Sequence, residues 1–238
     1  MRRVDEVDIK CCGAISMQLL LVALLWLVNA PGYSATRVAC PVPNVTLFSD
    51  QAEDGELACQ AVGTTLAFMR SQGFRVDAEF TIDLVDRPLS LHGTEVTGTY
   101  DSRSFHIKVP NFKNARLMAL RHPPFRMRMC RTIWQSFVAH EVAHAVAHAN
   151  FQISKPSLEA HEYIAYVVQL ATLPQALRQQ LLEAFDQPAF QHERQISRIF
   201  LQLAPEVFGV KAYRHYAAEP DPQAFFQRLL NRRLRSLH

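Results

Sequence analysis

The pattern of apolar and polar positions along the chain changes character near residue 123. Before that position, short segments that alternate and are rich in β-branched residues predict strands, and one longer segment predicts a helix. The predicted strands cover 45–48 and 74–86, a predicted hairpin covers 95–109, and the predicted helix covers 50–73. Residues 36–122 are therefore expected to form a mixed α/β lobe.

The second arm of the predicted hairpin, Ser104 to Val109, alternates strictly. Its apolar and polar side chains point to opposite faces, with Phe105, Ile107 and Val109 on one face and His106 and Lys108 on the other. Such a segment is typical of a half-exposed strand. We therefore expect this arm to lie at an edge of the sheet.

From Pro123 onward the pattern favours helices and predicts no strand. The predicted helices, which are separated by prolines, cover 125–149, 157–173, 175–186, 190–203 and 222–235. The segment 209–219 is expected to be a loop. The back half is thus a helical lobe over 123–238, and the fold class is α+β.

The N-terminal segment has the features of a targeting signal. An apolar run from Leu19 to Val28 follows a polar start and precedes the helix-breaking Pro31 and Gly32. Because the run is shorter than the roughly 20 residues that span a bilayer, residues 1–35 are predicted to be a secretory signal peptide. The protein is then expected to be exported, to a periplasm or to the medium. The alternative is an uncleaved anchor that associates the protein with a membrane.

Removal of the first 35 residues would leave three cysteines, Cys40, Cys59 and Cys130. In an oxidising compartment, Cys40 and Cys59 could join the mature N-terminus to the first helix, with Cys130 as a buried thiol. The alternative is that all three are unpaired and behave as small core residues.

Length and composition narrow the class of protein further. The chain has 238 residues, of which 49% are hydrophobic and 20% are charged, so residues 36–238 can bury one sizeable core as a single domain. The net charge of +3 is small, and no basic patch is interleaved with aromatic residues. A nucleic-acid partner is therefore excluded. The oligomeric state is left open.

One stretch of the predicted helix, SFVAHEVAHAVAHANF at 136–151, carries histidines inside an apolar run. His140 and His144 are four residues apart and so share one helix face, where both imidazoles can reach one ion. Glu141 lies about 100° around the helix from His140, beside the ligands. A carboxylate in that position can act as general base toward a metal-activated water.

The segment HEVAH is the H-E-x-x-H signature, and a random shuffle of this composition would give roughly 0.02 such motifs. In this segment the chain resembles the zincin metallopeptidases, which implies a catalytic zinc. The metzincin continuation is excluded because Ala147 and Asn150 occupy its glycine and histidine positions. The resemblance is therefore to the gluzincins, whose third ligand is a glutamate on the next helix.

The gluzincin resemblance implies Glu162 as the third ligand, 18 residues beyond His144. Glu159 and His161 are the alternatives, on a helix expected to start at Pro156 and Ser157. Several gluzincins place an acid three or four residues after the ligand glutamate, where it orients the first histidine. Here those positions are Ala165 and Tyr166, so the support must come from elsewhere.

The resemblance also implies a hydrogen-bond donor for the transition state, supplied by the C-terminal part of the chain. Tyr213 and His215 are the candidates for this catalytic role. His148, one turn beyond His144, fits no zincin ligand spacing and is expected to be structural or to support a ligand.

The fold implied by the resemblance is a small twisted mixed sheet above the motif helix, with zinc in the cleft between the lobes. A peptide or protein substrate would lie along an edge strand, for which Ser104 to Val109 is the candidate. The leading hypothesis is an exported zinc-dependent peptidase. Two alternatives are a zincin-shaped binding or scaffolding protein without catalysis, and a membrane-tethered helical protein in which the motif is accidental.

Overall fold

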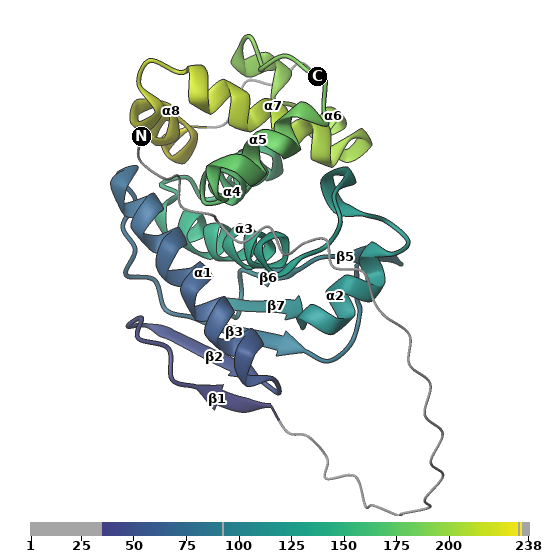
Figure 1. The fold of residues 1–238 in the computed structure, drawn as a ribbon. Coiled ribbons are helices and arrows are strands. Elements are labelled where there is room, and N and C mark those ends of the chain that lie inside the picture. Colours follow the sequence, from purple (N-terminus) through teal and green to yellow (C-terminus); the bar gives the residue numbers. More distant parts are fainter. Residues whose placement is uncertain (1–34, 92, 233, 235–238) are drawn as a thin grey trace, which may run out of the picture. The chain divides into compact units, whose positions relative to one another are not determined.

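A mixed sheet and a set of helices make up the computed structural model, which describes residues 35–91, 93–232 and 234 (Figure 1). The strands are β1 (Thr36–Val38), β2 (Val45–Ser49), β3 (Phe80–Val85), β4 (Leu89–Leu91), β5 (Thr94–Val96), β6 (Thr99–Asp101) and β7 (His106–Pro110). The α-helices are α1 (Ala52–Ser71), α2 (Phe112–Ala119), α3 (Arg131–Asn150), α4 (Leu158–Ala171), α5 (Gln175–Glu183), α6 (Arg198–Leu203), α7 (Pro205–Ala218) and α8 (Pro222–Asn231). Apart from Ala35, the predicted signal peptide lies outside the described residues.

The main sheet has five strands in the order β1-β2-β3-β7-β6. β2, β3 and β7 run parallel, whereas β1 and β6 pair antiparallel with β2 and β7 at the two edges. β4 and β5 form a separate two-stranded hairpin. After residue 123, the described part of the chain contains helices and no strand. The α+β class and the mixed sheet are therefore confirmed.

The position of β7 corrects the predicted edge strand. β7 pairs with β3 on one side and β6 on the other, so β6 is the edge. The alternation in this arm instead reflects one exposed face of the sheet, where His106 Nε2 lies 2.8 Å from the Asp83 carboxylate of the next strand. Apolar alternation reports which face is buried, and it does not report whether a strand has one neighbour or two.

Local signals explain where α1 ends and where α4 begins. α1 ends before Gly73, which has a φ of +85° that favours glycine. α4 begins after Ser157, whose hydroxyl accepts a hydrogen bond from Ala160 N at 3.3 Å, as the Pro156–Ser157 start predicted. The predicted strand at 74–86 is shorter, because only Phe80–Val85 pairs with other strands.

α3 occupies the centre of the unit formed by the residues from 34 onward. It contacts α1, β6 and β7 on the sheet side and α4 on the other, and α4 in turn packs against α7 (Figure 1). Its apolar residues surround the helix, as expected of a helix that is buried on all sides. The two predicted lobes therefore meet along α3.

A disulfide joins Cys40 to Cys59 on α1, as the oxidising-compartment reading predicted. Cys130 is a free thiol, and it is half-buried where full burial was expected. Within the described residues, no helix is both long and apolar enough to cross a bilayer.

The buried Asp54 carboxylate holds the starts of three helices together. It accepts a hydrogen bond from Phe112 N at 2.8 Å and pairs with the Arg131 guanidinium, which also lies 2.6 Å from the Glu53 carboxylate. The Asp54 side chain is 5% exposed, whereas the Glu53 side chain is 65% exposed. Arg131 thus pairs with one buried carboxylate, Asp54, and one exposed carboxylate, Glu53, so the contributions of the two pairs to stability can be compared.

We expect Asp54→Ala to lower the free energy of unfolding by about 2–4 kcal/mol, because it leaves a backbone N–H and a partly buried guanidinium without their acceptor. Glu53→Ala, the matched control, should cost about 1 kcal/mol or less. Urea unfolding followed by circular dichroism would measure both. Equal effects of the two variants would contradict the proposed role of Asp54.

Candidate metal centre

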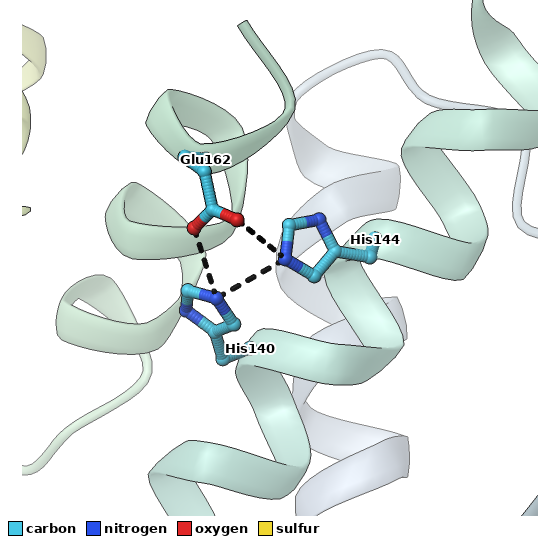
Figure 2. Close-up of side chains that lie close together, drawn as sticks. All are labelled: His140, His144 and Glu162. Atoms are coloured by element: carbon cyan, nitrogen blue, oxygen red, sulfur yellow. Dashed lines mark hydrogen bonds and ion pairs between the residues drawn. The ribbon is translucent and has the colours of Figure 1, made fainter. Parts of the chain in front are cut away.

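Three side chains from two neighbouring helices converge on one point (Figure 2). His140 Nε2 and His144 Nε2, from α3, lie 3.1 Å apart. The Glu162 carboxylate, from α4, lies 3.3 Å from His140 Nε2 and 3.5 Å from His144 Nε2. The pairing of α3 with α4 thus brings together residues that are 18 positions apart in the sequence.

The spacing of these three atoms suits a metal ion. Ligand bonds of about 2.0–2.2 Å in a tetrahedral arrangement place neighbouring ligand atoms about 3.3–3.6 Å apart. The two imidazole Nε2 atoms lie 3.1 Å apart, and each lies 3.3 or 3.5 Å from its own oxygen of the Glu162 carboxylate, which is close to this spacing. The group could therefore hold a metal ion and leave a fourth position open.

The two alternative third ligands lie elsewhere. Glu159 is buried, but it belongs neither to this group nor to the lining of the adjacent cavity. The His161 ring lies over Phe151 at 4.4 Å and stacks against His148 at 6.3 Å between ring centroids. Among the described residues, only His140, His144 and Glu162 form a group of three or more such ligands.

A chain of hydrogen bonds fixes the orientation of His140. Its Nδ1 lies 3.0 Å from the Gln169 amide oxygen, and Gln169 Nε2 donates to Ser136 Oγ at 3.2 Å. The Ser136 hydroxyl in turn donates to Ile133 O at 2.7 Å. Because the amide oxygen can only accept, Nδ1 carries the ring proton and Nε2 presents its lone pair to the ligand triangle.

Burial and charge shift the pKa values of the cluster in different directions. Burial lowers the pKa of His144 to about 3. Burial also opposes ionisation of His140, but the hydrogen bond and charge of Glu162 outweigh it and raise the pKa of His140. The pKa of Glu162 falls to about 2, because the charges of His144 and His140 overcome the effect of burial. The triangle therefore presents an ionised carboxylate and one neutral imidazole.

Glu141 is buried beside the ligand triangle. Burial raises the pKa of Glu141 to about 7, and the Glu162 charge acts in the same direction. The backbone at Gly98, just before β6, lies against its carboxylate: a Cβ on residue 98 would come within 2.5 Å of Glu141 Oε1. Gly98 therefore allows the edge of the sheet to approach this carboxylate closely.

A cavity of about 1360 Å³ opens onto the cluster. His140, His144, Glu162 and Glu141 all line it. Its walls come from the β4–β5 hairpin, the segment Thr97–Tyr100, α2, and the start of α7. Glu141 and the ligand triangle thus face a space large enough for a substrate several residues long.

The structure does not bring Tyr213 and His215 to this cavity. The predicted loop is wrong, because both residues belong to α7 and pack between helices. His215 Nδ1 lies 2.7 Å from the Tyr163 hydroxyl, and its Nε2 lies 3.3 Å from the Glu219 carboxylate. The Arg178 guanidinium lies over the Tyr213 ring, with its carbon 5.6 Å from the ring centroid. Sequence reasoning missed α7 because it took the segment after Gly209 for a loop.

His148 supports the cavity wall without joining the ligands. Its ring packs edge-on against Tyr100 and Phe105, with centroid distances of 6.0 and 5.4 Å. This agrees with the expectation that His148 is structural.

Three residues of the site were not identified from the sequence: Gln169, Tyr166 and Gly98. A local signal existed for the first two, because Glu162, Tyr166 and Gln169 follow the i, i+4, i+7 spacing of one helix face. Gln169 is also a fully buried amide among apolar neighbours on the helix, Val167, Val168 and Leu170. No signal of this kind marks Gly98, whose role depends on how the sheet meets α3.

Mass spectrometry of the purified protein is expected to find about one metal ion per chain. His144→Ala and Glu162→Ala should lose it, because each removes a corner of the ligand triangle. His148→Ala and Glu159→Gln, which change neighbouring residues of the same types, should retain it. Loss of the metal from all four variants would argue against this ligand set.

Gln169→Leu should weaken metal binding about 10- to 100-fold, because the His140 ring loses the acceptor that fixes its orientation. Competition with a chromophoric chelator would measure the change in dissociation constant. Gln179→Leu on α5, whose amide reaches only Glu183, serves as the control and should bind the metal as the wild type does. Unchanged affinity in Gln169→Leu would show that the hydrogen bond has no influence on the site.

Comparison with known proteins places the chain without assigning an activity. No curated protein and no solved structure matches it. Residues 45–235, which include β2 through α8 and every residue of the cluster, match the model of a family of unknown function, DUF6639. Since the match spans most of the sequence, the chain belongs to the DUF6639 family.

Proposed function

We propose that the protein is an exported zinc-dependent peptidase of gluzincin type. The observation that carries the proposal is the convergence of His140, His144 and Glu162 on one point, with Glu141 beside them in the same cavity. Two imidazoles and one carboxylate, with a fourth position open to a cavity, are the donor set of a catalytic zinc site.

Zinc bound there would supply Lewis acidity toward a water molecule and toward the substrate carbonyl. Glu141 is placed to take a proton from the attacking water as its oxygen bonds to the carbonyl carbon. The same carboxyl group then returns a proton to the amine as the C–N bond breaks. Gly98 leaves room for the Glu141 carboxylate beside the sheet.

The edge strand β6 offers a place for an extended peptide. It pairs only with β7 in the main sheet, and the segment Thr97–Tyr100 lines the cavity. A peptide that adds to this edge would run past the cluster with its main chain hydrogen-bonded to the sheet. β6 thus takes the role that the sequence suggested for Ser104 to Val109. A mixed sheet with its edge beside the motif helix is also the arrangement expected of a zincin.

Two observations support export. The first is the apolar run at Leu19 to Val28, which is typical of a signal peptide. The second is the disulfide between Cys40 and Cys59, since such bonds persist mainly in oxidising compartments. A peptidase with this disulfide would act outside the cytoplasm.

The position of Glu141 also favours catalysis over a purely structural metal site. A structural site requires ligands and gains nothing from a further carboxylate beside them. Burying such a carboxylate costs free energy, which a catalytic role would explain.

Glu141→Gln should retain the metal and lose hydrolysis by at least about 10²-fold, because the amide cannot accept the proton of the attacking water. Cleavage of a fluorogenic peptide library, followed by liquid chromatography, would measure activity beside metal content. Glu183→Gln, an exposed change on α5, is the matched control and should cleave as the wild type does.

Full activity in Glu141→Gln would refute the mechanism. A wild-type protein that binds the metal and cleaves nothing in the library would instead favour a zincin-shaped binding protein. Absence of stoichiometric metal after zinc reconstitution would show that the motif is accidental.

A further inference from the structure

With Tyr213 and His215 away from the cavity, the donor for the negative charge that develops on the carbonyl oxygen must come from another residue of the cavity wall. Two tyrosines line the cavity, Tyr100 and Tyr166. The Tyr100 hydroxyl makes no hydrogen bond within the described residues. Because it is buried, a substrate cannot reach it in this conformation. Tyr166 therefore becomes the candidate.

The Tyr166 ring is held against a ligand of the cluster. It lies one helical turn after Glu162 on α4 and meets the His140 ring edge-to-face, with 4.8 Å between centroids. Phe125 and Phe208 pack on it from other directions, with centroid distances of 6.3 and 6.2 Å. The ring position is thus fixed by contacts from several elements.

Gly209 on α7 provides the space that this ring position requires. A Cβ on residue 209 would come within 2.5 Å of Tyr166 Cδ1 and 2.8 Å of Cγ. Because the colliding atoms belong to a ring that also packs against His140, Phe125 and Phe208, a larger residue at 209 would displace the ring from this position. α7 therefore contributes to the site because Gly209, which has no side chain, leaves room for the Tyr166 ring.

Tyr166 lines the same cavity as three carboxylates, those of Glu162, Glu206 and Glu141. Burial raises the pKa of Tyr166 well above its usual range, and the charges of Glu162, Glu206 and Glu141 act in the same direction. These carboxylates come from three different helices and all line the cavity. No hydrogen bond of the Tyr166 hydroxyl is found within the described residues, and the hydroxyl is not among their fully buried unpaired atoms, so it is open to the cavity that Tyr166 lines.

Glu206 keeps a different partner. Its carboxylate accepts a hydrogen bond from Phe125 N at 2.6 Å, and Phe125 and Arg126 both have left-handed backbone conformations, with φ of +50° and +58°. The carboxylate thus stabilises a strained turn beneath the Tyr166 ring. This turn and Gly209 hold the ring from two sides.

We infer that Tyr166 is a catalytic residue, whose hydroxyl donates a hydrogen bond to the oxyanion of the tetrahedral intermediate; this rests on the proposed peptidase function. When the water oxygen bonds to the carbonyl carbon, the π electrons of the C=O bond move onto its oxygen and Glu141 takes the water proton. Tyr166 keeps its own proton throughout and stabilises the charge only while it exists. When the C–N bond breaks, the C=O bond forms again and the amine receives the proton from Glu141.

Tyr166→Phe tests the inference, with Tyr213→Phe as the matched control. In Tyr166→Phe we expect the metal content of the wild type, a KM within about threefold, and a kcat lower by about 10²-fold, because the donor acts only in the transition state. Calorimetry with a phosphinic dipeptide carrying leucine-like side chains, which mimics the tetrahedral state, should show affinity weaker by about 10- to 100-fold. Tyr213→Phe should match the wild type in every measurement.

The remaining outcomes separate this inference from the proposed function. A zinc-bearing Tyr166→Phe variant with wild-type kcat and wild-type phosphinate affinity would overturn it. Loss of zinc from Tyr166→Phe would also overturn it, because the ring would then serve only to place His140. A wild type that cleaves nothing defeats the peptidase proposal, and phosphinate binding still decides the donor role. Weaker binding by Tyr166→Phe supports that role, and equal or absent binding rejects it.

Discussion

The pairing of α3 with α4 is the constraint on which the candidate site depends. α3 is buried around its circumference, and alanines at 139, 143, 145 and 147 keep it slim enough to pass between the sheet and the helical half. In that position the side chains of His140 and His144 are only 12% and 11% exposed. Burial of such groups is tolerated only when they are paired, and α4 provides the pairing through Glu162.

The same balance of charge explains why the residue hydrogen-bonded to His140 is an uncharged one, Gln169. Two carboxylates, Glu141 and Glu162, already lie in a small buried volume. An aspartate or glutamate behind His140 would add a third negative charge, whereas the Gln169 amide fixes the ring without adding any. Gln169 in turn donates a hydrogen bond to the Ser136 hydroxyl, which donates to the backbone of α3 at Ile133. The helix that carries the ligand thus also anchors its orienting partner.

The sequence was sufficient for features that depend on residues close together in the chain. Helical periodicity placed His140, Glu141 and His144 on α3, and apolar patterns separated the mixed front half from the helical back half. Glu162 came from a resemblance in spacing, and the structure brings it to the two histidines. Features set by tertiary contacts were missed: the edge position of β6, the helix α7, and the partners of His140. Alternation in β7 could not reveal that the strand has a second neighbour. Gly209 suggested a loop at Tyr213 and His215, but it lies within a helix, where its missing side chain leaves room for the Tyr166 ring.

In the proposed peptidase, the close approach of Gly98 to Glu141 restricts which residues can occupy position 98 beside the proposed base. A Cβ at position 98 would come within 2.5 Å of Glu141 Oε1, so a larger residue there would have to displace the carboxylate. The flanking residues Thr97 and Thr99 line the same cavity, so substitutions there would reshape the cavity wall without placing a Cβ at position 98. Libraries aimed at redirecting the site would therefore hold position 98 fixed and diversify its two neighbours.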